Sequence, residues 1–357
     1  KARYGEEKAG EEGRMMGNER SGAPKTWQEE GDGLVRCLLC HHTCRLREGG
    51  VGRCGVRRAV AGEVTSLVYG RVVAANIDPI EKKPLYHVLP GSRTYSIATL
   101  GCNFTCRHCQ NATISQVGEG VAVQHSGVAR EPGEIVAAAV AGGCRSISYT
   151  YVEPTVFFEY AYDCSRLAVQ AGLGNIFVSN GYMTGQTIDH LAPLLTAINI
   201  DLKAWDDAFY KRVCGGSLQP VLDSIARCRE RGIWVEVTTL LIPGVNDGDG
   251  DLAAIADFLV SLDASIPWHV SAYHPAHLMQ QPGPTPAATL VRARDIGLAR
   301  GLHHVYTGNR AGCGGEDTLC PQCGLVLITR QGYRIGELRL AGGRCPACGT
   351  AIAGVWQ

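Results

Sequence analysis

Short runs of β-branched and aromatic residues alternate with stretches of helical spacing over most of this chain, beginning near residue 95. The runs that we expect to form strands cover residues 96–100, 146–153, 175–180, 197–204, 234–243 and 268–275. The helical stretches between and after them cover residues 132–142, 155–171, 187–195, 217–231, 249–262 and 286–300. Six such alternations predict an α/β fold, in which helical crossovers connect the strands of a parallel sheet.

Nearly all the polar residues that suggest chemistry follow the C-terminal ends of these predicted strands, where α/β barrels place their active sites. We therefore expect a partial, incompletely closed (β/α)6 barrel over residues 95–310. A flat, doubly wound sheet is the alternative, because periodicity does not distinguish the two. Residues 303–308 are a candidate for one further strand.

The segments on either side of this core differ from it in composition. Residues 1–33 contain Gly, Glu, Arg and Lys with little apolar content, which predicts a disordered tail. Residues 34–94 form an N-terminal four-cysteine segment and a β-like lead-in, where three prolines exclude a regular helix from residues 76–90. Residues 317–357 are Gly-rich and hairpin-like, and we expect them to form a separate small module.

The charges of the 357-residue chain are balanced, with 34 basic and 34 acidic side chains. This balance gives no overall field that would attract nucleic acid or an anionic membrane. No apolar run reaches the length of about 18 residues that a membrane span requires. We therefore expect no nucleic-acid partner and no membrane association.

Cysteine is the unusual residue, with 16 in the chain. Eleven of them fall into three tight clusters, at positions 37/40/44/54, 102/106/109 and 320/323/345/348. Closely spaced thiolates converge on a metal more readily than they form disulfides. Such thiols must stay reduced, which predicts a cytoplasmic protein. The remaining five are expected to be mostly small buried residues: Cys144, Cys164, Cys214, Cys228 and Cys313.

The central cluster directly follows the first predicted barrel strand and comprises Cys102, Cys106 and Cys109. Three thiolates at this spacing on one loop can bind three irons of a [4Fe–4S] cluster and leave the fourth iron open. An open metal position lets a substrate or cofactor coordinate. This Cys-x3-Cys-x2-Cys motif, placed after the first strand of a six-unit barrel, resembles that of the radical S-adenosylmethionine (SAM) superfamily.

The resemblance implies a specific chemistry. In that superfamily the open iron binds the amino and carboxylate groups of SAM, and an electron from the cluster cleaves SAM to methionine and a 5′-deoxyadenosyl radical. That radical then abstracts hydrogen from a substrate. The residue before the third cysteine is usually aromatic and packs beside the adenine; here it is His108, a flat but titratable ring.

Polar residues at later strand ends match further positions of the superfamily. Glu153 would receive the SAM amino group, although a carboxylate before proline also suits the start of a helix. Asn180 lies in an Asn-Gly turn that resembles one in glycyl-radical activating enzymes, where it would hydrogen-bond SAM or simply favour the turn. His274 matches a histidine near the SAM and substrate pocket of those activases, with a satisfied loop residue as the alternative.

The fourth predicted strand places Asn199, Asp201 and Lys203 on one face by its period of two. Polar residues on the inner face of a barrel are costly unless they are paired. The Asp-x-Lys pair resembles an Asp-Leu-Lys of the activases that approaches the SAM ribose and carboxylate; a structural ion pair is the alternative. The resemblance assigns no catalytic residue beyond the cluster cysteines.

Two near-identical Cys-Pro-x-Cys-Gly segments supply the C-terminal set: Cys320, Cys323, Cys345 and Cys348. Two such turns predict a tetrahedral four-thiolate site of the zinc-ribbon type, with a single iron as the alternative. All four positions are filled, so this site is expected to be structural. The less regular N-terminal set predicts either a second structural zinc, the preferred interpretation, with His41 or His42 as a further candidate ligand, or an auxiliary [4Fe–4S] cluster for electron delivery. This set is Cys37, Cys40, Cys44 and Cys54.

Together with the cysteine motifs, several segments resemble one subfamily, the AmmeMemoRadiSam-system radical SAM enzymes, which are relatives of the pyruvate formate-lyase activases. These segments are residues 67–73, 78–84, 151–155, 201–203, 306–309 and 354–356. The resemblance implies a low-potential electron donor of the flavodoxin or ferredoxin type, and Memo-like and AMMECR-type pathway partners. It does not name a substrate, and for residues 78–84 we expect a substrate-side loop.

The leading hypothesis is hydrogen-atom abstraction from an unidentified small molecule or peptide. A glycyl-radical-enzyme activase is the first alternative, although a minimal activase needs neither flanking cysteine set. A non-catalytic interaction protein with zinc at all three clusters is the second alternative. The polar pair Asp201 and Lys203 on an inner face argues against it.

Overall fold

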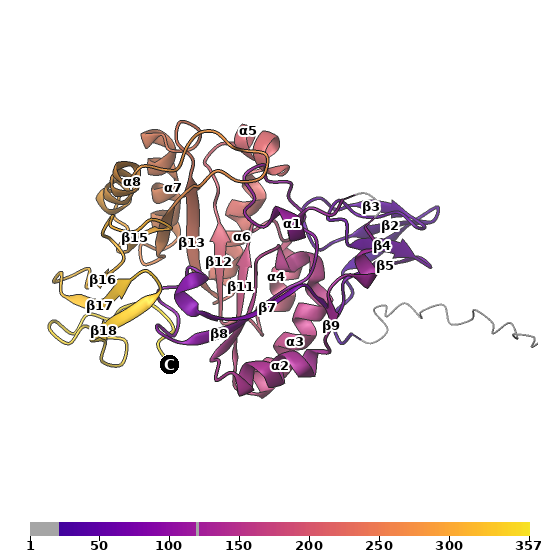
Figure 1. Cartoon of the computed structure of the whole chain (residues 1–357), viewed down its shortest axis with the longest axis horizontal. Coiled ribbons are helices and arrows are strands. Elements are labelled where there is room, and N and C mark those ends of the chain that lie inside the picture. Colours follow the sequence, from indigo (N-terminus) through magenta and orange to yellow (C-terminus); the bar gives the residue numbers. More distant parts are fainter. Residues whose placement is uncertain (1–20, 119–120) are drawn as a thin grey trace, which may run out of the picture.

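The computed structural model describes residues 21–118 and 121–357, and an eight-stranded sheet forms its centre (Figure 1). The strand order is β15-β14-β13-β12-β11-β10-β8-β7, with β7 and β15 at the two edges. All neighbours from β8 to β15 pair in parallel, whereas β7 pairs antiparallel with β8. The strands are β7 (Ala74–Pro79), β8 (Arg93–Ala98), β10 (Ser146–Tyr149), β11 (Gly174–Ser179), β12 (Ala197–Asp201), β13 (Trp234–Leu241), β14 (Trp268–Ala272) and β15 (Val305–Gly308).

Each crossover between parallel strands contains a helix that packs on the sheet or on its neighbouring helix. The long helices are α2 (Pro132–Ala141), α3 (Phe158–Gln170), α4 (Gly185–Leu191), α6 (Gln219–Glu230), α7 (Asp249–Leu262) and α8 (Ala287–Ala299). Shorter helices are η2 (Ile80–Lys82), α1 (Ala112–Ser115), η3 (Val123–His125), η4 (Pro154–Phe157), α5 (Asp207–Phe209) and η5 (Tyr210–Cys214). The predicted α/β fold with a parallel sheet is confirmed, and residues 305–308 form the further strand.

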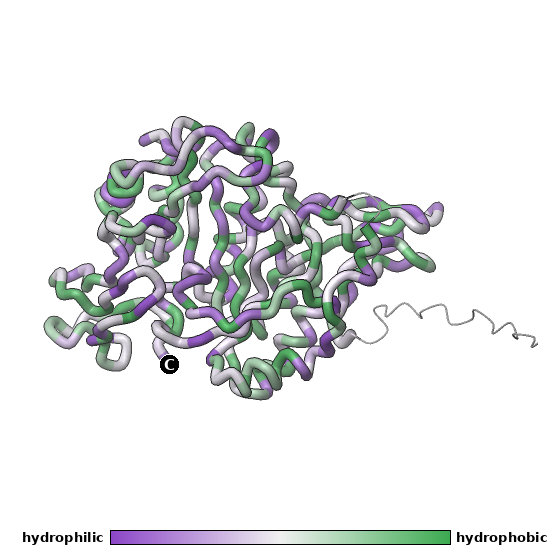
Figure 2. Tube along the Cα trace, viewed as in Figure 1, coloured by the Kyte–Doolittle hydropathy of each residue, from purple (hydrophilic) through white to green (hydrophobic). Residues whose placement is uncertain are grey.

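The inner strands are buried along nearly their whole length, as expected when a parallel sheet is covered on both faces. Figure 2 shows apolar stretches along the central sheet that polar positions interrupt. Those polar positions are in register across strands, since Asn199 pairs with Glu236, Asp201 with Thr238, and Thr238 with His269. The sheet therefore carries a row of polar side chains inside an otherwise apolar core.

The N-terminal module comprises two small antiparallel sheets. It lies at one end of the molecule, and the C-terminal strands lie at the other end (Figure 1). Its strands are β1 (Trp27–Gly31), β2 (Leu34–Cys37), β3 (Arg45–Arg47), β4 (Arg57–Val60) and β5 (Glu63–Ser66). Residues 27–31 therefore belong to a strand and not to the predicted tail. The reason is Trp27, which is buried in the core while the strand pairs with β2. The first twenty residues of that tail lie outside the described part of the chain.

The N-terminal module docks on the barrel through buried polar contacts. The guanidinium of Arg57 donates two hydrogen bonds to the carboxylate of Glu159 on α3. The Thr184 hydroxyl donates to the backbone oxygen of Leu38 at 2.7 Å, and a β-bridge joins Cys40 to Met183. The first cysteine set is thereby held against the loop that follows β11. The short strands β6 (Arg71–Val72) and β9 (Val128–Ala129) pair antiparallel and so join the lead-in to the segment that precedes α2.

The C-terminal module is a three-stranded antiparallel sheet of β16 (Thr318–Leu319), β17 (Val326–Gln331) and β18 (Arg334–Leu338). It has its own small apolar core around Leu327 and Ile328. Backbone hydrogen bonds of 2.7 Å link Val355 to His87 and Leu89 in the lead-in, and Arg330 donates to the Tyr86 carbonyl at 2.7 Å. The module is thus fastened to the segment that precedes β8. No helix among the described residues is long and apolar enough to cross a membrane.

Candidate active site

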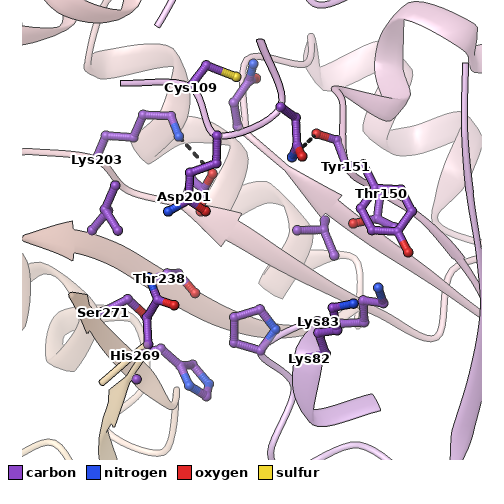
Figure 3. Close-up of a pocket in the computed structure, with 18 of the residues that line it drawn as sticks. Lys82, Lys83, Cys109, Thr150, Tyr151, Asp201, Lys203, Thr238, His269 and Ser271 are labelled. Atoms are coloured by element: carbon purple, nitrogen blue, oxygen red, sulfur yellow. Dashed lines mark hydrogen bonds and ion pairs between the residues drawn. The ribbon is translucent and has the colours of Figure 1, made fainter. Parts of the chain in front are cut away.

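A cavity of about 860 Å³ lies at the C-terminal ends of the parallel strands. Its volume falls within the range of about 300–1,000 Å³ that is usual for small-molecule sites. Figure 3 shows Cys109, Asp201 and Lys203 on one side of it and Lys82, Lys83 and His269 on the other. Its lining comes from most of the sheet and from the turn at residues 331–333 between β17 and β18. The arrangement is that of an α/β barrel site.

The structure brings Cys102, Cys106 and Cys109 together in the lining of this cavity, on the loop between β8 and α1. Gly101 starts the loop with φ +96°, and a Cβ there would lie 2.5 Å from the Val56 side chain, so glycine is required. The Phe104 backbone N–H donates to the Cys102 sulfur at 3.4 Å. The loop therefore aims its thiols into the cavity through its own backbone geometry.

The surroundings of the three thiols fit an iron–sulfur cluster. A hydrogen bond with Cys214 lowers the pKa of Cys106 against the effect of burial, and the ammonium of Lys203 adds to this lowering, which favours the thiolate that binds metal. Burial and the nearby Glu153 raise the pKa of Cys102, so this thiol needs a metal to ionise. The sulfur atoms are not packed into a compact single-ion group, unlike those of the C-terminal set. Three separated thiolates on one loop suit three irons of a cubane.

Asp201 and Lys203 lie at the end of β12 and form an ion pair with an Nζ–Oδ2 distance of 2.8 Å. Burial disfavours the charged amine, but Asp201 and Cys106 outweigh it and raise the pKa of Lys203. The amine is therefore charged beside the cysteine loop. Asn199 shares their strand but is fully buried, and its amide donates to the Pro84 carbonyl at 2.8 Å. Asp201 and Lys203 line the cavity as a pair, while Asn199 anchors the lead-in.

Glu153 also lines the cavity, but protein donors occupy its carboxylate. Thr155 donates through both its backbone N–H and its hydroxyl, and the other donors are the Ser179 hydroxyl and the Asn180 backbone N–H. A carboxylate offers about four acceptor positions, and these bonds use them. Burial raises the pKa of Glu153, although the same hydrogen bonds oppose this effect. The geometry matches the helix-start role at η4, and a contact with SAM stays a prediction.

Asn180 stabilises the turn after β11 and also approaches the cysteine loop. Its Oδ1 accepts a hydrogen bond from the Tyr182 backbone at 3.0 Å, which is the turn role. Its Nδ2 donates to the Asn103 side chain at 2.7 Å and lies 3.9 Å from the Cys102 sulfur. Asn180 therefore connects the third barrel strand to the loop that carries the cysteines.

His108 is buried in the cavity lining, and its Nδ1 has no hydrogen-bond partner. Burial and the nearby ammonium of Lys203 lower the pKa of His108 to about 3. The ring therefore stays neutral near pH 7 and presents a flat surface. The ring of Phe209 lies 6.2 Å from that of His108, centroid to centroid, in a tilted arrangement. A neutral flat ring is compatible with the adenine position that the resemblance implies.

His274 is the predicted site residue that the structure does not bring to the cavity. It is exposed, it is absent from the lining, and its Nε2 hydrogen-bonds the Asn309 carbonyl at 3.2 Å. This geometry is that of the satisfied loop residue. The histidine that does line the cavity is His269, on β14, whose Nε2 is 2.6 Å from the buried carboxylate of Glu236. The sequence could have indicated His269, because it lies two residues before Ser271 and the two therefore share one face of the strand.

A second polar group in the lining lies on the lead-in, in the stretch at residues 78–84. Asp78 accepts hydrogen bonds from Lys83 at 2.6 Å, from Lys82 at 2.9 Å and from the Tyr151 hydroxyl at 2.5 Å. Burial lowers the pKa of Lys83 to about 8, against the opposing effect of Asp78. Tyr151 has φ +65°, a strained backbone that is typical of functional sites. The cavity lining includes Lys82, Lys83 and Tyr151. The spacing of these residues in the sequence did not predict this position.

The C-terminal cysteines form a compact group of four, with all ligand atoms within 4.8 Å of one another. Cys320 and Cys348 are 3.5 Å apart, and Cys323 and Cys345 are 3.7 Å apart, sulfur to sulfur. A tetrahedron with metal–sulfur bonds of about 2.3 Å has edges of about 3.8 Å. The set therefore fits a single tetrahedral ion, and it lies on the module away from the cysteine loop.

Comparison with known proteins places the chain in a class. A model of the radical SAM superfamily matches residues 96–259. The uncharacterized protein MJ0808 of Methanocaldococcus jannaschii is 41% identical over 324 residues, which make up 90% of this chain and 96% of that protein. The chain therefore carries a radical SAM domain over residues 96–259. It belongs to the same family as MJ0808.

Two further proteins match over shorter stretches. The isethionate sulfite-lyase activating enzyme of Nitratidesulfovibrio vulgaris is 32% identical over 115 residues, 31% of this chain and 38% of that enzyme. The crystal structure of a domain of pyruvate-formate lyase-activating enzyme from Bacteroides vulgatus superimposes with a TM-score of 0.41 at 22% identity, covering 46% of this chain and 99% of that domain.

Proposed function

We propose that this protein holds a [4Fe–4S] cluster at Cys102, Cys106 and Cys109, cleaves SAM reductively beside it and abstracts a hydrogen atom from a substrate in the same cavity. One observation carries the proposal: the three thiols, the Asp201–Lys203 pair and the ring of His108 line one cavity at the strand ends. When bound there, the cluster supplies the electron that converts SAM to methionine and a 5′-deoxyadenosyl radical.

The chain's own residues hold and orient SAM in this proposal. The charged amine of Lys203 binds the carboxylate of SAM, and the Asp201 carboxylate, which is partly exposed, accepts hydrogen bonds from the ribose hydroxyls. The neutral ring of His108 packs beside the adenine. Glu153 fixes the turn to which Asn180 belongs, and both stay candidates for the SAM amino group.

The opposite side of the cavity is the proposed substrate side. Lys82 and Lys83 on η2 and its C-cap lie across from Cys109 in Figure 3. Their ammonium groups share one carboxylate, Asp78, so the group of three carries a net positive charge when both amines are protonated. This charge favours a substrate with an anionic group such as a carboxylate or phosphate.

A glycyl-radical-enzyme activase is the second candidate, and the 32% identity over 115 residues with the isethionate sulfite-lyase activating enzyme favours it. The subfamily assignment to the AmmeMemoRadiSam system also belongs to this proposal, with Memo-like and AMMECR-type proteins as its pathway partners. A flavodoxin- or ferredoxin-like donor would supply the electrons. We further propose that the C-terminal ion is zinc and that the protein is cytoplasmic. The sixteen free cysteines suit a reducing compartment.

Anaerobic reconstitution with iron and sulfide, followed by dithionite and SAM, tests the proposal. We expect a brown protein that produces 5′-deoxyadenosine, which mass spectrometry detects. The variant with Cys102→Ala, Cys106→Ala and Cys109→Ala should produce none, while Cys144→Ala, a buried cysteine away from the cavity, should match the wild type. A colourless protein that binds zinc at all three cysteine sets would overturn the proposal in favour of a non-catalytic interaction protein.

Deuterium transfer identifies the substrate side. Candidate substrates labelled at one carbon are incubated with the reconstituted protein, and transfer of deuterium into 5′-deoxyadenosine marks the hydrogen donor. We expect transfer from an anionic small molecule or peptide. Transfer from a glycine of a partner protein instead would support the activase candidate.

A further inference from the structure

The N-terminal cysteines line a second, separate cavity. Cys37, Cys40, Cys44 and Cys54 converge there from β2, the turn after it and the segment before β4. All four are free thiols in the structure. Asn103 and the arginines Arg53 and Arg57 also line this cavity. Four thiols around one cavity, with the charge of Arg57 close to Cys54, form a site that can hold an anionic, sulfur-ligated group.

The spacing of these thiols separates a cluster from a single ion. Zinc or a lone iron draws four sulfurs to about 3.8 Å, the edge of a tetrahedron with bonds of about 2.3 Å. Over residues 21–118 and 121–357, the C-terminal cysteines are the only set of three or more His, Cys, Asp or Glu ligand atoms within 4.8 Å of one another. The N-terminal set is wider, as is the central set. A cubane suits a wider set than a single ion does, because each thiolate binds a different iron.

The second observation is a buried donor beside this cysteine set. Asn103 is 1% exposed, its Nδ2 has no oxygen or nitrogen partner, and its side chain lies beside the Cys40 thiol. Its other polar atoms are occupied, since Oδ1 accepts from Asn180 at 2.7 Å and the backbone oxygen accepts from His42 Nε2 at 2.8 Å. A buried amide donor without a strong acceptor is unfavourable, so an acceptor in the cavity would stabilise this arrangement. Sulfides and thiolates of a cluster accept such hydrogen bonds.

The histidines next to these cysteines leave the ligand set to the thiols. His42 directs Nε2 to the Asn103 backbone, and its ring packs 4.8 Å from that of Tyr182, centroid to centroid. His41 has its backbone N–H bonded to the Tyr182 carbonyl and its ring 5.6 Å from the Tyr182 ring, and it is absent from the cavity lining. Neither arrangement directs a ring nitrogen into the cavity as a fifth ligand.

We propose that Cys37, Cys40, Cys44 and Cys54 hold an auxiliary [4Fe–4S] cluster that passes electrons to the cluster of Cys102, Cys106 and Cys109. Four cysteine ligands leave no iron open, which suits electron transfer and not substrate chemistry. The proposal that the site holds a cluster stands on its own, whereas the destination of the electron rests on the proposed function. This assignment replaces structural zinc, the interpretation that the sequence favoured for these residues.

Asn103 provides the connection between the two sites. It follows Cys102 directly in the chain, its Oδ1 lies 3.9 Å from the Cys102 sulfur, and its side chain lines the N-terminal cavity. The Asn103 side chain also approaches the Cys40 thiol closely enough to interact with it, and this contact opposes the burial that raises the pKa of that thiol to about 12. One residue thus separates the two sets of ligands. In each cycle one electron from a low-potential one-electron reductant enters the auxiliary cluster and one leaves it, so its charge is restored.

Metal analysis of the variant with Cys102→Ala, Cys106→Ala and Cys109→Ala tests the auxiliary cluster without any SAM chemistry. After anaerobic reconstitution we expect about four irons and four sulfides per chain to remain, plus the ion of the C-terminal set. Dithionite should then produce the electron paramagnetic resonance signal of a reduced cubane. A colourless variant that holds zinc at the N-terminal set would overturn the proposal.

The reciprocal variant, with Cys37, Cys40, Cys44 and Cys54 all changed to Ser, is the matched arm. It should lose about half of the cluster iron of the wild type. If it does not fold, Mössbauer counting of cubanes in the wild type decides the same question, since one cubane per chain overturns the proposal and two support it. If the reconstituted wild type does not cleave SAM while the triple-alanine variant keeps its iron, the proposed function is wrong and the auxiliary cluster is still supported.

The Asn103→Leu substitution tests the connecting residue. In the triple-alanine background, loss of a hydrogen-bond donor should shift the midpoint potential of the remaining cluster to a more negative value, because such donors stabilise the reduced, more negative state. Asn111→Leu is the control, since its amide donates to the Tyr151 carbonyl and it lines only the larger cavity. An unchanged potential in Asn103→Leu would overturn the role of Asn103.

Discussion

The guanidinium of Arg57 and the carboxylate of Glu159 form two hydrogen bonds of 2.7 Å across the boundary between the N-terminal module and the barrel. Both side chains are only 3% exposed. Although burial opposes ionisation, Arg57 holds the pKa of Glu159 below its ordinary value. This pair is the buried ionic link that keeps the first cysteine set against α3.

Removal of one partner of this pair should destabilise the protein strongly. We expect Glu159→Gln to lower the free energy of unfolding by about 3–5 kcal/mol, because it leaves a buried guanidinium without a counter-charge. Denaturant unfolding of the reconstituted protein measures this loss. Asp257→Asn breaks the exposed pair with Arg300 and should cost less than about 1 kcal/mol. Equal losses in the two variants would show that the buried pair has no special weight.

His108 should behave as a neutral aromatic surface. Because its pKa is lowered to about 3, SAM affinity should show no histidine titration between about pH 5.5 and 8. We expect His108→Phe to bind SAM as the wild type does, and His108→Ala to bind about tenfold more weakly through loss of ring contact. Equilibrium binding at several pH values measures both. A drop in affinity centred near pH 6.5 in the wild type alone would contradict this account.

Lys203 should matter for SAM and not for the metal. Lys203→Met removes a charge-assisted hydrogen bond, which predicts SAM binding weaker by about 10- to 100-fold. Iron content should stay near that of the wild type, because the thiols remain. Lys211→Met is the control, since Lys211 pairs with Asp207 on an exposed helix turn away from the cavity. Unchanged SAM affinity in Lys203→Met would reduce the Asp201–Lys203 pair to a structural role.

Lys83 gives a prediction about pH and stability. Burial lowers its pKa from 10.5 to about 8, so between those values the unfolded chain binds more protons than the folded one. Stability of the wild type should therefore rise with pH in this window relative to Lys83→Met, which lacks the titrating amine. A shift of this size corresponds to about 3 kcal/mol at most. Urea unfolding of both proteins at pH 7.5 and pH 9.5 checks the sign. A wild-type stability that falls with pH relative to that of Lys83→Met would refute the prediction.

The parallel core could be predicted from the sequence because its signals are local. The helix expected at residues 249–262 has those bounds as α7, and each expected strand overlaps a strand of the sheet. The cysteine loop was also predictable, since its three thiols occupy one short segment. Period-two alternation placed Asp201 and Lys203 together before any contact was known. Each of these features depends on neighbours within a few residues.

The remaining features depend on contacts between distant segments. Trp27 stands alone in a polar stretch, and only its pairing with β2 and burial reveal a strand. The contact between His269 and Glu236 spans two strands, so it depends on their register. His274 follows β14 closely, yet the loop turns it towards Asn309 and solvent. The direction in which a side chain points after the end of a strand depends on the conformation of the loop, and the spacing of residues in the sequence does not predict that conformation.

The turn at residues 331–333 lines the large cavity although it belongs to the C-terminal module, which carries the compact four-cysteine group. Part of the cavity lining therefore sits on a module that has its own apolar core and its own cysteine group. Substitutions in this turn can reshape the binding surface without disturbing the packing of the barrel strands. The shape of the cavity can thus change on this side while the loop that carries Cys102, Cys106 and Cys109 stays as it is.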